Sequence, residues 1–267
     1  MLYRMSHVRD VHWVNETLAV VVVGSRIMLL NIDEDLEVTS EVMLPQFHTD
    51  LIREVCISQQ APHNMLSGGF DGKVFVSDIT RLSQDILDKK HNSENNVLDI
   101  GEVISSLTWH LDDPHRASFT TDAGGLYLFD TRTGTDSCAY YHVGKTHLYC
   151  HAYRDQNILL LGFGDGEIQV YDVRKTNLVE CVRDPCQRQI GELRFDPTRT
   201  SMATFGIPDV SIWRADEILE IRSHVGPDIL SFAVEDFKTS GEYMPFAQSP
   251  LLAVTDSAGQ ICFYSGE

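Results

Sequence analysis

GFGDGEIQVYDVR, residues 162–174, is open to two interpretations. A glycine-rich loop after a strand can cradle a phosphate group, and such a loop continues into a helix, usually with a Lys-Ser or Lys-Thr pair. An Asp-Gly turn instead joins two antiparallel strands, because glycine adopts the positive φ angle that a tight hairpin requires. Here the glycines are followed by EIQVYD, in which apolar residues alternate as in a half-buried strand. The segment therefore predicts a hairpin turn.

The same segment recurs along the chain. Residues 166–172 (GEIQVYD) have two strong counterparts, GKVFVSD at 72–78 and GGLYLFD at 124–130. Weaker copies are SRIMLLN at 25–31, PDVSIWR at 208–214 and GQICFYS at 259–265. The six copies are spaced by about 42 to 52 residues, inside or slightly above the interval typical of propeller blades. The chain is therefore expected to consist of repeats of one structural unit.

Each repeat has the pattern of an antiparallel sheet. An apolar run precedes each turn and an alternating strand follows it, as expected for a hairpin. Another strand is predicted before each hairpin, at residues 8–13, 52–57, 104–109, 148–153, 190–195 and 229–234. Fourth strands are predicted at 38–44, 97–100, 137–143, 178–182 and 217–223. Four strands per repeat predict an all-β fold, a single β-propeller of about six blades over residues 1–267.

With these features the repeats resemble those of the WD-repeat family over essentially the whole chain. Asp78, Asp130 and Asp172 stand at the family's Asp position, and Trp213 stands where the family usually has Trp. The Gly-His dipeptide of the family is missing. The resemblance implies a propeller whose faces bind protein partners.

The two ends of the chain predict how the ring closes. The last repeat ends its third strand at Tyr264, with no room for a fourth, and residues 1–6 precede the first repeat. We expect this N-terminal strand to complete the last blade, which would remove two exposed sheet edges. A seventh blade, within the longest interval between repeats, is an alternative to the count of six. However, residues 79–101 contain few strand-forming residues, and predict a helix over 81–90, with Leu82, Ile86 and Leu87 on one side, then a mobile polar loop over 91–96.

Composition narrows the class of protein. The chain has 267 residues, 43% hydrophobic and 22% charged, which is typical of a globular protein. The longest apolar run, residues 18–23, is far too short to cross a bilayer, and the N-terminus lacks the apolar core of a signal peptide. We therefore expect an intracellular protein, cytoplasmic or nuclear, whose six cysteines are reduced thiols. A net charge of −18 argues against direct binding to nucleic acid or to an anionic membrane.

Catalytic and metal sites find little support. Common nucleophile and zinc motifs are missing, and His142, His147, Cys150, His151, Cys181 and Cys186 match no standard zinc spacing. We expect no cofactor and no enzymatic activity. The residues at the repeat turns have a structural role in this interpretation, because Asp in a turn bonds its own backbone; they are Asp71, Gly72, Asp122, Asp165, Gly166 and Asp256.

A partner-binding surface is expected at one rim of the propeller. In WD-repeat proteins, which this chain resembles, contacts typically come from residues just before and within the first strand of each blade. Here those residues are Arg9, Asp10, His48, Asp50, Arg53, Glu54, Ser105, Ser106, Tyr149, Glu192 and Ser231. Each of them, taken singly, is equally compatible with a solvated rim.

Two Asp-x-Arg segments suggest a specific partner. Phe129 to Arg132 reads FDTR and Tyr171 to Arg174 reads YDVR. They resemble the boxes through which some WD-repeat proteins bind the adaptor of cullin-type ubiquitin ligases, so Arg132 and Arg174 are candidate adaptor contacts. The alternative is that both arginines form salt bridges or hydrogen bonds between blades. The leading hypothesis is a non-catalytic scaffold subunit of a larger protein assembly; a ligase substrate receptor is the second, and a propeller enzyme a distant third.

Overall fold

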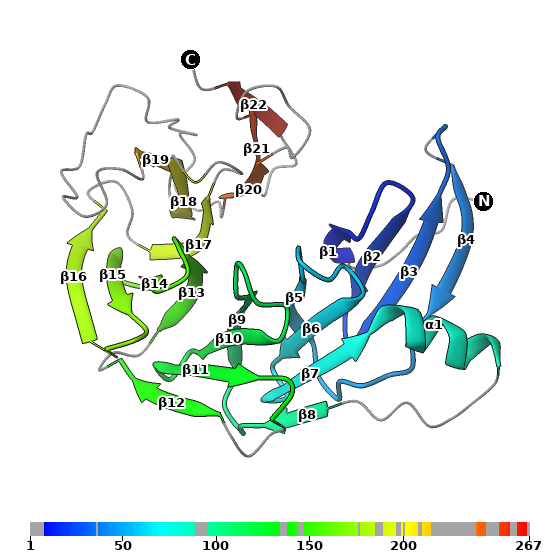
Figure 1. The fold of residues 1–267 in the computed structure, drawn as a ribbon. Coiled ribbons are helices and arrows are strands. Elements are labelled where there is room, and N and C mark those ends of the chain that lie inside the picture. Colours follow the sequence, from blue (N-terminus) through cyan, green and yellow to red (C-terminus); the bar gives the residue numbers. More distant parts are fainter. Residues whose placement is uncertain are drawn as a thin grey trace. The chain divides into compact units, whose positions relative to one another are not determined.

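The computed structural model describes residues 8–35, 37–88, 96–133, 138–143, 147–175, 177–184, 189–195, 199, 201–207, 210–214, 239–243, 251–256 and 261–265. These residues form antiparallel β-sheets and a single helix (Figure 1). The chain divides into two compact units, Met1–Gly144 and Lys145–Glu267. Each unit is described by itself.

The first unit contains three four-stranded sheets, each in the order of its strands along the chain. Sheet A consists of β1 (Val8–Trp13), β2 (Leu18–Val23), β3 (Arg26–Ile32) and β4 (Val38–Met43). Sheet B consists of β5 (Ile52–Ile57), β6 (Asn64–Gly69), β7 (Lys73–Asp78) and β8 (Asn96–Asp99). Sheet C consists of β9 (Ile104–Trp109), β10 (Arg116–Thr121), β11 (Gly125–Asp130) and β12 (Ala139–His142).

The second unit contains one sheet of four strands and, among its described residues, two sheets of three strands. Sheet D has four strands: β13 (Leu148–Tyr153), β14 (Ile158–Phe163), β15 (Glu167–Asp172) and β16 (Asn177–Arg183). Sheet E has β17 (Gln189–Phe195), β18 (Ser201–Ile207) and β19 (Val210–Arg214), and sheet F has β20 (Thr239–Tyr243), β21 (Leu251–Asp256) and β22 (Ile261–Ser265). The predicted all-β fold of repeated antiparallel sheets is confirmed, and four strands per sheet, as in propeller blades, are present in sheets A to D.

The first strand of sheet F differs from the sequence prediction. The strand that pairs with β21 is β20, Thr239–Tyr243, in which Thr239 lies opposite Asp256. The strands predicted at 217–223 and 229–234 lie outside the described residues, as do the N-terminal segment 1–6 and loop residues 91–95. Asp256, predicted in a turn, is the last residue of β21. The sequence TSGEY lacks the apolar spacing of the other first strands, so sequence patterning does not predict β20.

The Asp-Gly segments are hairpin turns. β6 pairs with β7, and β14 with β15, in uninterrupted antiparallel register. Between these strands Gly72 has a φ of 71° and Gly166 a φ of 79°, and Gly124 takes 91° in sheet C. This left-handed backbone is readily adopted only by glycine. The hairpin interpretation of GFGDGEIQVYDVR is therefore confirmed.

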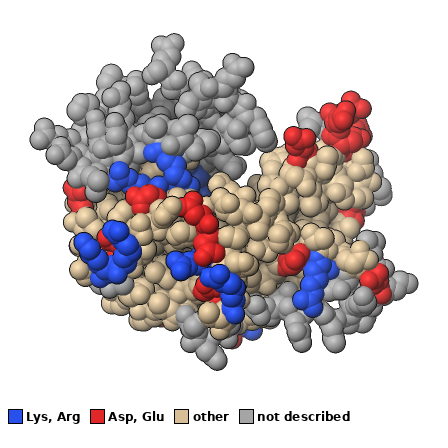
Figure 2. Space-filling view, in the orientation of Figure 1, with Lys and Arg blue, Asp and Glu red and all other residues tan. Residues whose placement is uncertain are grey.

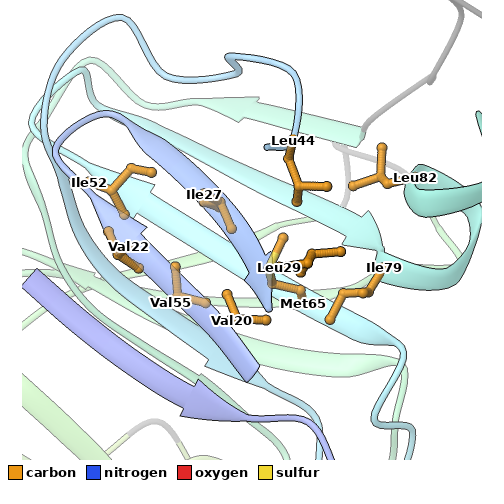
Figure 3. Close-up of a cluster of buried hydrophobic side chains, with 10 residues drawn as sticks. All are labelled: Val20, Val22, Ile27, Leu29, Leu44, Ile52, Val55, Met65, Ile79 and Leu82. Atoms are coloured by element: carbon orange, nitrogen blue, oxygen red, sulfur yellow. The ribbon is translucent and has the colours of Figure 1, made fainter. Parts of the chain in front are cut away.

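Buried strands with both faces covered explain the apolar runs. Met65 and Leu66 are neighbours on β6 and point to opposite faces of sheet B. Met65 belongs to a core that joins sheets A and B and includes Val20 and Leu29 (Figure 3). Leu66 belongs to a second core, between sheets B and C, together with Phe119. In the second unit sheets D and E share a third core.

The helix α1, Ile79–Leu87, lies in the longest interval between repeats. It begins two residues before the predicted start, because the Asp78 carboxylate accepts the N–H of Arg81 (3.0 Å) and so caps the first turn. Ile79 and Leu82 are buried in the core of sheets A and B. This part of the helix therefore packs on its own unit. Among the described residues, no helix is both long and apolar enough to span a membrane.

Candidate partner-binding surface

Two backbone hydrogen bonds fix the hairpin turn of sheets B, C and D. In the first bond, the N–H of the first turn residue donates to the carbonyl of the residue that precedes the first strand of the same sheet. The pairs, donor first, are Phe70 and Leu51 (2.9 Å), Asp122 and Val103, and Gly164 and His147. In the second bond, the carbonyl of the turn glycine accepts the N–H of the residue that follows the fourth strand. The pairs, donor first, are Ile100 and Gly72 (2.9 Å), Val143 and Gly124, and Asp184 and Gly166. Each turn is thus held from two sides. We call this end of each sheet the turn end.

These bonds use the groups that a phosphate loop would need. The N–H of Gly164 bonds His147, that of Gly166 bonds Phe163, and that of Glu167 bonds the Asp165 carboxylate (3.2 Å). A phosphate-binding loop leaves its N–H groups pointing at the ligand. Here they are used within the protein, and the turn continues into a strand.

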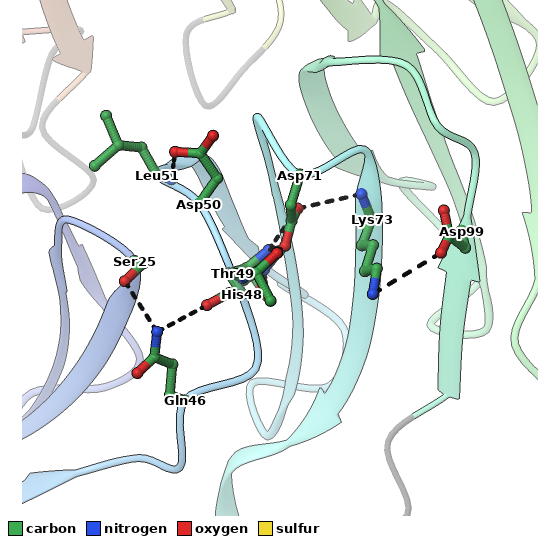
Figure 4. Close-up of polar contacts among 10 residues, drawn as sticks. Ser25, Gln46, His48, Thr49, Asp50, Leu51, Asp71, Lys73 and Asp99 are labelled. Atoms are coloured by element: carbon green, nitrogen blue, oxygen red, sulfur yellow. Dashed lines mark hydrogen bonds and ion pairs between the residues drawn. The ribbon is translucent and has the colours of Figure 1, made fainter.

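His48 is buried, with 1% of its surface exposed, although its position predicted a rim residue. Its Nδ1 lies 3.0 Å from both carboxylate oxygens of Asp71, and its Nε2 lies 2.9 Å from the Ser67 hydroxyl (Figure 4 shows Asp71 beside His48). The Phe75 ring packs edge-on against the imidazole. Burial lowers the pKa of His48, against the opposing effect of Asp71. Because it is buried, the imidazole of His48 offers no surface to a partner.

Asp71 has more partners than a turn residue requires. Its carboxylate accepts the N–H of Lys73 across the turn (3.2 Å), as predicted for a turn Asp, and also the N–H of Thr49 (3.0 Å). Sheet E contains a related pair, because the Thr204 hydroxyl donates to the buried carboxylate of Asp184 (2.8 Å). In both sheets a polar side chain from the preceding loop is bound to a hydroxyl on the second strand.

Glu54, a predicted rim residue, links two sheets. Its Oε2 accepts the N–H of Leu107 on β9 (2.8 Å), and nearby the indole N–H of Trp109 donates to the carbonyl of Cys56 (3.1 Å). β9 is the first strand of sheet C, and only one of its edges pairs with β10. At the other edge of β9, the Glu54 carboxylate thus supplies an acceptor for the backbone N–H of Leu107, and the Trp109 side chain adds a second hydrogen bond between the two sheets.

The remaining predicted rim residues fall into three groups. Ser105 and Ser106 are buried, and the Ser105 hydroxyl bonds that of Thr120 (2.9 Å), so neither is a rim side chain. Asp10 and Glu192 each contact a neighbour on the same strand: the Asp10 carboxylate lies 2.8 Å from Nε2 of His12, and Glu192 forms an ion pair with Arg194. Asp50 is exposed, Arg53 and Tyr149 are half-buried, and the side chain of Arg9 and all of Ser231 lie outside the described residues.

In sheets B and D, the second residue of the first strand lies over the turn. In sheet D this residue is Tyr149, whose ring lies so close to Gly164 that a Cβ there would be 2.8 Å from it. In sheet B it is Arg53, whose guanidinium lies 6.0 Å from the centre of the Phe70 ring. Phe70 and its neighbour Leu51 are exposed by 40% and 47%. Sequence reasoning missed both residues, and the only signal was an aromatic residue at a turn position occupied elsewhere by Asp122 or Gly164.

The two Asp-x-Arg segments have the same geometry. Arg132 donates to both carboxylate oxygens of Asp130, and Arg174 does so to Asp172 at 3.0 and 2.7 Å. Arg132 also lies 3.6 Å from Asp113. The hydrogen bonds from arginine lower the pKa of each carboxyl, Asp130 and Asp172, to about 2. Each Asp–Arg pair closes the turn after a third strand within one sheet, while 54% of the Arg132 side chain and 61% of the Arg174 side chain are exposed.

Within the described ranges, no three His, Cys, Asp or Glu side chains are placed to hold a metal ion. Among the described cysteines, Cys150 is buried, Cys56 and Cys138 are half-buried and Cys181 is exposed. Burial raises the pKa of Cys138 to about 11, whereas Cys181 is exposed.

Comparison with protein-family models and with curated protein sequences finds no match for this chain.

Proposed function

We propose that the protein is a non-catalytic scaffold that binds peptides or partner domains through the turn ends of its sheets, as a subunit of a larger assembly. The observation that carries the proposal is that the backbone of the turns is held in the same way in three sheets, whereas the side chains at the turns differ. The same pair of backbone bonds holds the turns of sheets B, C and D, yet the first turn residue is Phe70, Asp122 and Gly164 respectively. Rigid elements that present different side chains at equivalent positions suit selective protein recognition.

The finer architecture belongs to the same proposal. We propose one WD-repeat-like propeller over residues 1–267, with one blade per sheet and an N-terminal strand that completes the last blade. The repeat spacing, the four-stranded sheets and the shared cores between successive sheets within each unit support it. We place the protein inside the cell, in the cytoplasm or nucleus, without a cofactor, and with protein rather than nucleic-acid partners. The net charge of −18 supports the last point.

Affinity purification of the full chain with crosslinking mass spectrometry tests the scaffold proposal. We expect stoichiometric protein partners whose crosslinks cluster near the turn ends. Recovery of the chain alone as a monomer, under conditions that preserve complexes, would contradict a role as an assembly subunit.

A ligase substrate receptor is the second candidate function. It is favoured by Arg132 and Arg174, which are held in the same geometry by Asp130 and Asp172 and remain more than half exposed. An Arg132→Ala/Arg174→Ala double variant should then lose a co-purifying cullin adaptor while retaining other partners. If the adaptor does not co-purify with the unsubstituted chain, this second function is excluded and the scaffold proposal is unaffected.

A further inference from the structure

We infer that the turn end of sheet B binds an extended protein segment in which a bulky apolar side chain is flanked by lysine or arginine. This inference rests on the proposed scaffold function, and it names one surface and the chemistry of its partner. The surface consists of Leu51, Phe70 and Arg53, bordered by Asp50, and we call it the Phe70 patch.

Leu51 and Phe70 form an exposed apolar pair on a rigid frame. The N–H of Phe70 donates to the carbonyl of Leu51, and the two strands meet so closely that a Cβ on Gly69 would lie 2.3 Å from that carbonyl oxygen. The turn itself does not need an aromatic residue, because sheets C and D form it with Asp122 and Gly164. An exposed aromatic residue on a fixed backbone is typical of interface anchors, since little conformational entropy is lost on binding.

Arg53 holds the aromatic ring in place. Its guanidinium lies over the Phe70 ring, 6.0 Å from the ring centre, which is within reach of a cation–π contact. Tyr149 lies over the turn of sheet D in the same way, close to Gly164. A covering residue from the first strand is therefore a recurring feature of these two sheets, and in sheet B it covers an exposed aromatic ring. This preorganises one face of the patch.

The β2–β3 turn of sheet A lies beside Leu51. The neighbouring turn of sheet A carries Gly24, whose carbonyl accepts the N–H of Ile52 (3.0 Å). A Cβ on Gly24 would lie 3.8 Å from Leu51 Cδ2, so any side chain there would extend toward Leu51. Glycine at this position leaves room for an extended backbone to approach.

One carboxylate borders the apolar pair. Asp50 directly precedes Leu51 and is exposed, and Figure 4 shows the two side by side. Asp122 takes the position of Phe70 in the adjoining sheet C and is half-exposed. Other exposed acidic side chains of this unit, Asp33, Glu34, Asp35 and Glu37, gather at the tip of the β3–β4 hairpin (Figure 2), which is the end of sheet A opposite its Gly24 turn, so they add to the overall negative charge and not to the border of the patch. With a net charge of −18, the protein attracts cationic segments from a distance, which favours lysine or arginine beside the apolar residue.

Selection from a displayed library of random ten-residue peptides tests the inference. We expect the wild-type protein to enrich peptides with an aliphatic or aromatic residue next to lysine or arginine. A synthetic peptide of the enriched sequence should bind about tenfold or more weakly to Phe70→Gly, which removes the anchor and installs the residue that sheet D has at this position. Asp50→Asn should weaken binding and reduce its dependence on salt.

Two controls separate binding from folding. Leu178→Ser removes an apolar side chain that is 48% exposed in the other unit, and should bind the peptide like wild type. Each variant must keep the thermal midpoint of the wild type to within a few degrees; Phe70→Asp, which installs the residue that sheet C has at this position, replaces Phe70→Gly if the glycine loosens the turn. The inference is overturned if no peptide is enriched, if the enriched peptides are acidic, or if the Phe70 variants bind as wild type. Crosslinked partners mapped to other turn ends would sustain the scaffold proposal even then.

Discussion

The carboxylate of Glu54 accepts the backbone N–H of Leu107 at 2.8 Å, and so joins the first strand of sheet B to the first strand of sheet C. A first strand has one edge without a neighbouring strand, and its N–H groups require another acceptor when they are partly buried. The side chain that supplies the acceptor is one that the sequence predicts at the rim. Adjacent sheets in this unit are thus joined by hydrogen bonds as well as by their apolar cores.

Removal of the Glu54 carboxylate should destabilise the first unit. We expect Glu54→Ala to lower the free energy of unfolding by about 1–3 kcal/mol, because the Leu107 N–H loses its acceptor. Glu54→Gln keeps an acceptor oxygen and should cost less. Urea unfolding of the three proteins, followed by tryptophan fluorescence, checks this order. Equal stabilities of Glu54→Ala and Glu54→Gln would show that the bond to Leu107 is dispensable.

His48 should make stability fall as the solution becomes mildly acidic. Burial lowers its pKa below the ordinary value of 6.5, so below pH 6.5 the unfolded chain binds a proton that the folded chain resists. The stabilising contribution is therefore complete above pH 6.5 and decreases as the pH falls toward the folded-state pKa, by at most about 1.4 kcal/mol per pH unit for one proton. Urea unfolding between pH 7.5 and about 5.5 should show a shallower pH dependence for His48→Gln. The exposed His142 provides the control His142→Gln, which should behave like wild type.

Two glycines separate backbone strain from crowding. Gly72 and Gly101 have similar φ angles, 71° and 74°, but a Cβ on Gly72 would lie 3.0 Å from the backbone of Gly101 and Glu102, whereas a Cβ on Gly101 would meet nothing within 4 Å. Gly101→Ala should cost about 1 kcal/mol from positive φ alone. Gly72→Ala should cost clearly more, and the difference between their denaturation midpoints measures the crowding. A larger cost at Gly101 would contradict the tight packing of the hairpin turn.

The Asp–Arg pairs should contribute to stability until the solution is strongly acidic. The pKa of Asp130 and of Asp172 is lowered to about 2 by arginine, from an unfolded value near 3.8, so their stabilisation is present above about pH 4 and is lost as the pH falls toward 2. Thermal unfolding between pH 5 and about 2 should show a smaller loss for Asp172→Asn than for wild type. Asp35→Asn, on the exposed tip of the β3–β4 hairpin, is the matched control. An unchanged acid profile for Asp172→Asn would exclude this contribution.

The thiols should differ in reactivity. The thiolate is the reactive form, and burial raises the pKa of Cys138 to about 11, while Cys181 is exposed. We expect iodoacetamide at about pH 8 to alkylate Cys181 well before Cys138, as measured by peptide mass spectrometry over time. The rate at Cys138 should continue to rise as the pH is raised toward its pKa of about 11. Simultaneous modification of both residues in the folded protein would disagree with the burial of Cys138.

The sequence predicted most strands because their signals are local. The alternation after each turn, the apolar run before it and glycine at the positive-φ position all act within a few residues, so the hairpins at 64–78, 116–130 and 158–172 follow from the chain alone. A strand without such spacing, β20, gives no such signal and is not predicted. The start of α1 also differs from its prediction, because the cap is a side chain at the end of the preceding strand.

The chain by itself thus determined the repeat, the hairpins and the alternation of faces, since all of them depend on backbone preferences and short-range patterning. Only the tertiary structure decided the roles of side chains beside the strands. His48, Ser105 and Ser106 precede or begin first strands as Asp50 does, but packing against Phe75, Thr120 and their surroundings buries them. Phe70 occupies the same turn position as Asp122. The remaining exposure of its ring depends on the position of Arg53, which belongs to another strand. Burial and hydrogen bonding across strands are set by neighbours in space, which local sequence patterns do not specify.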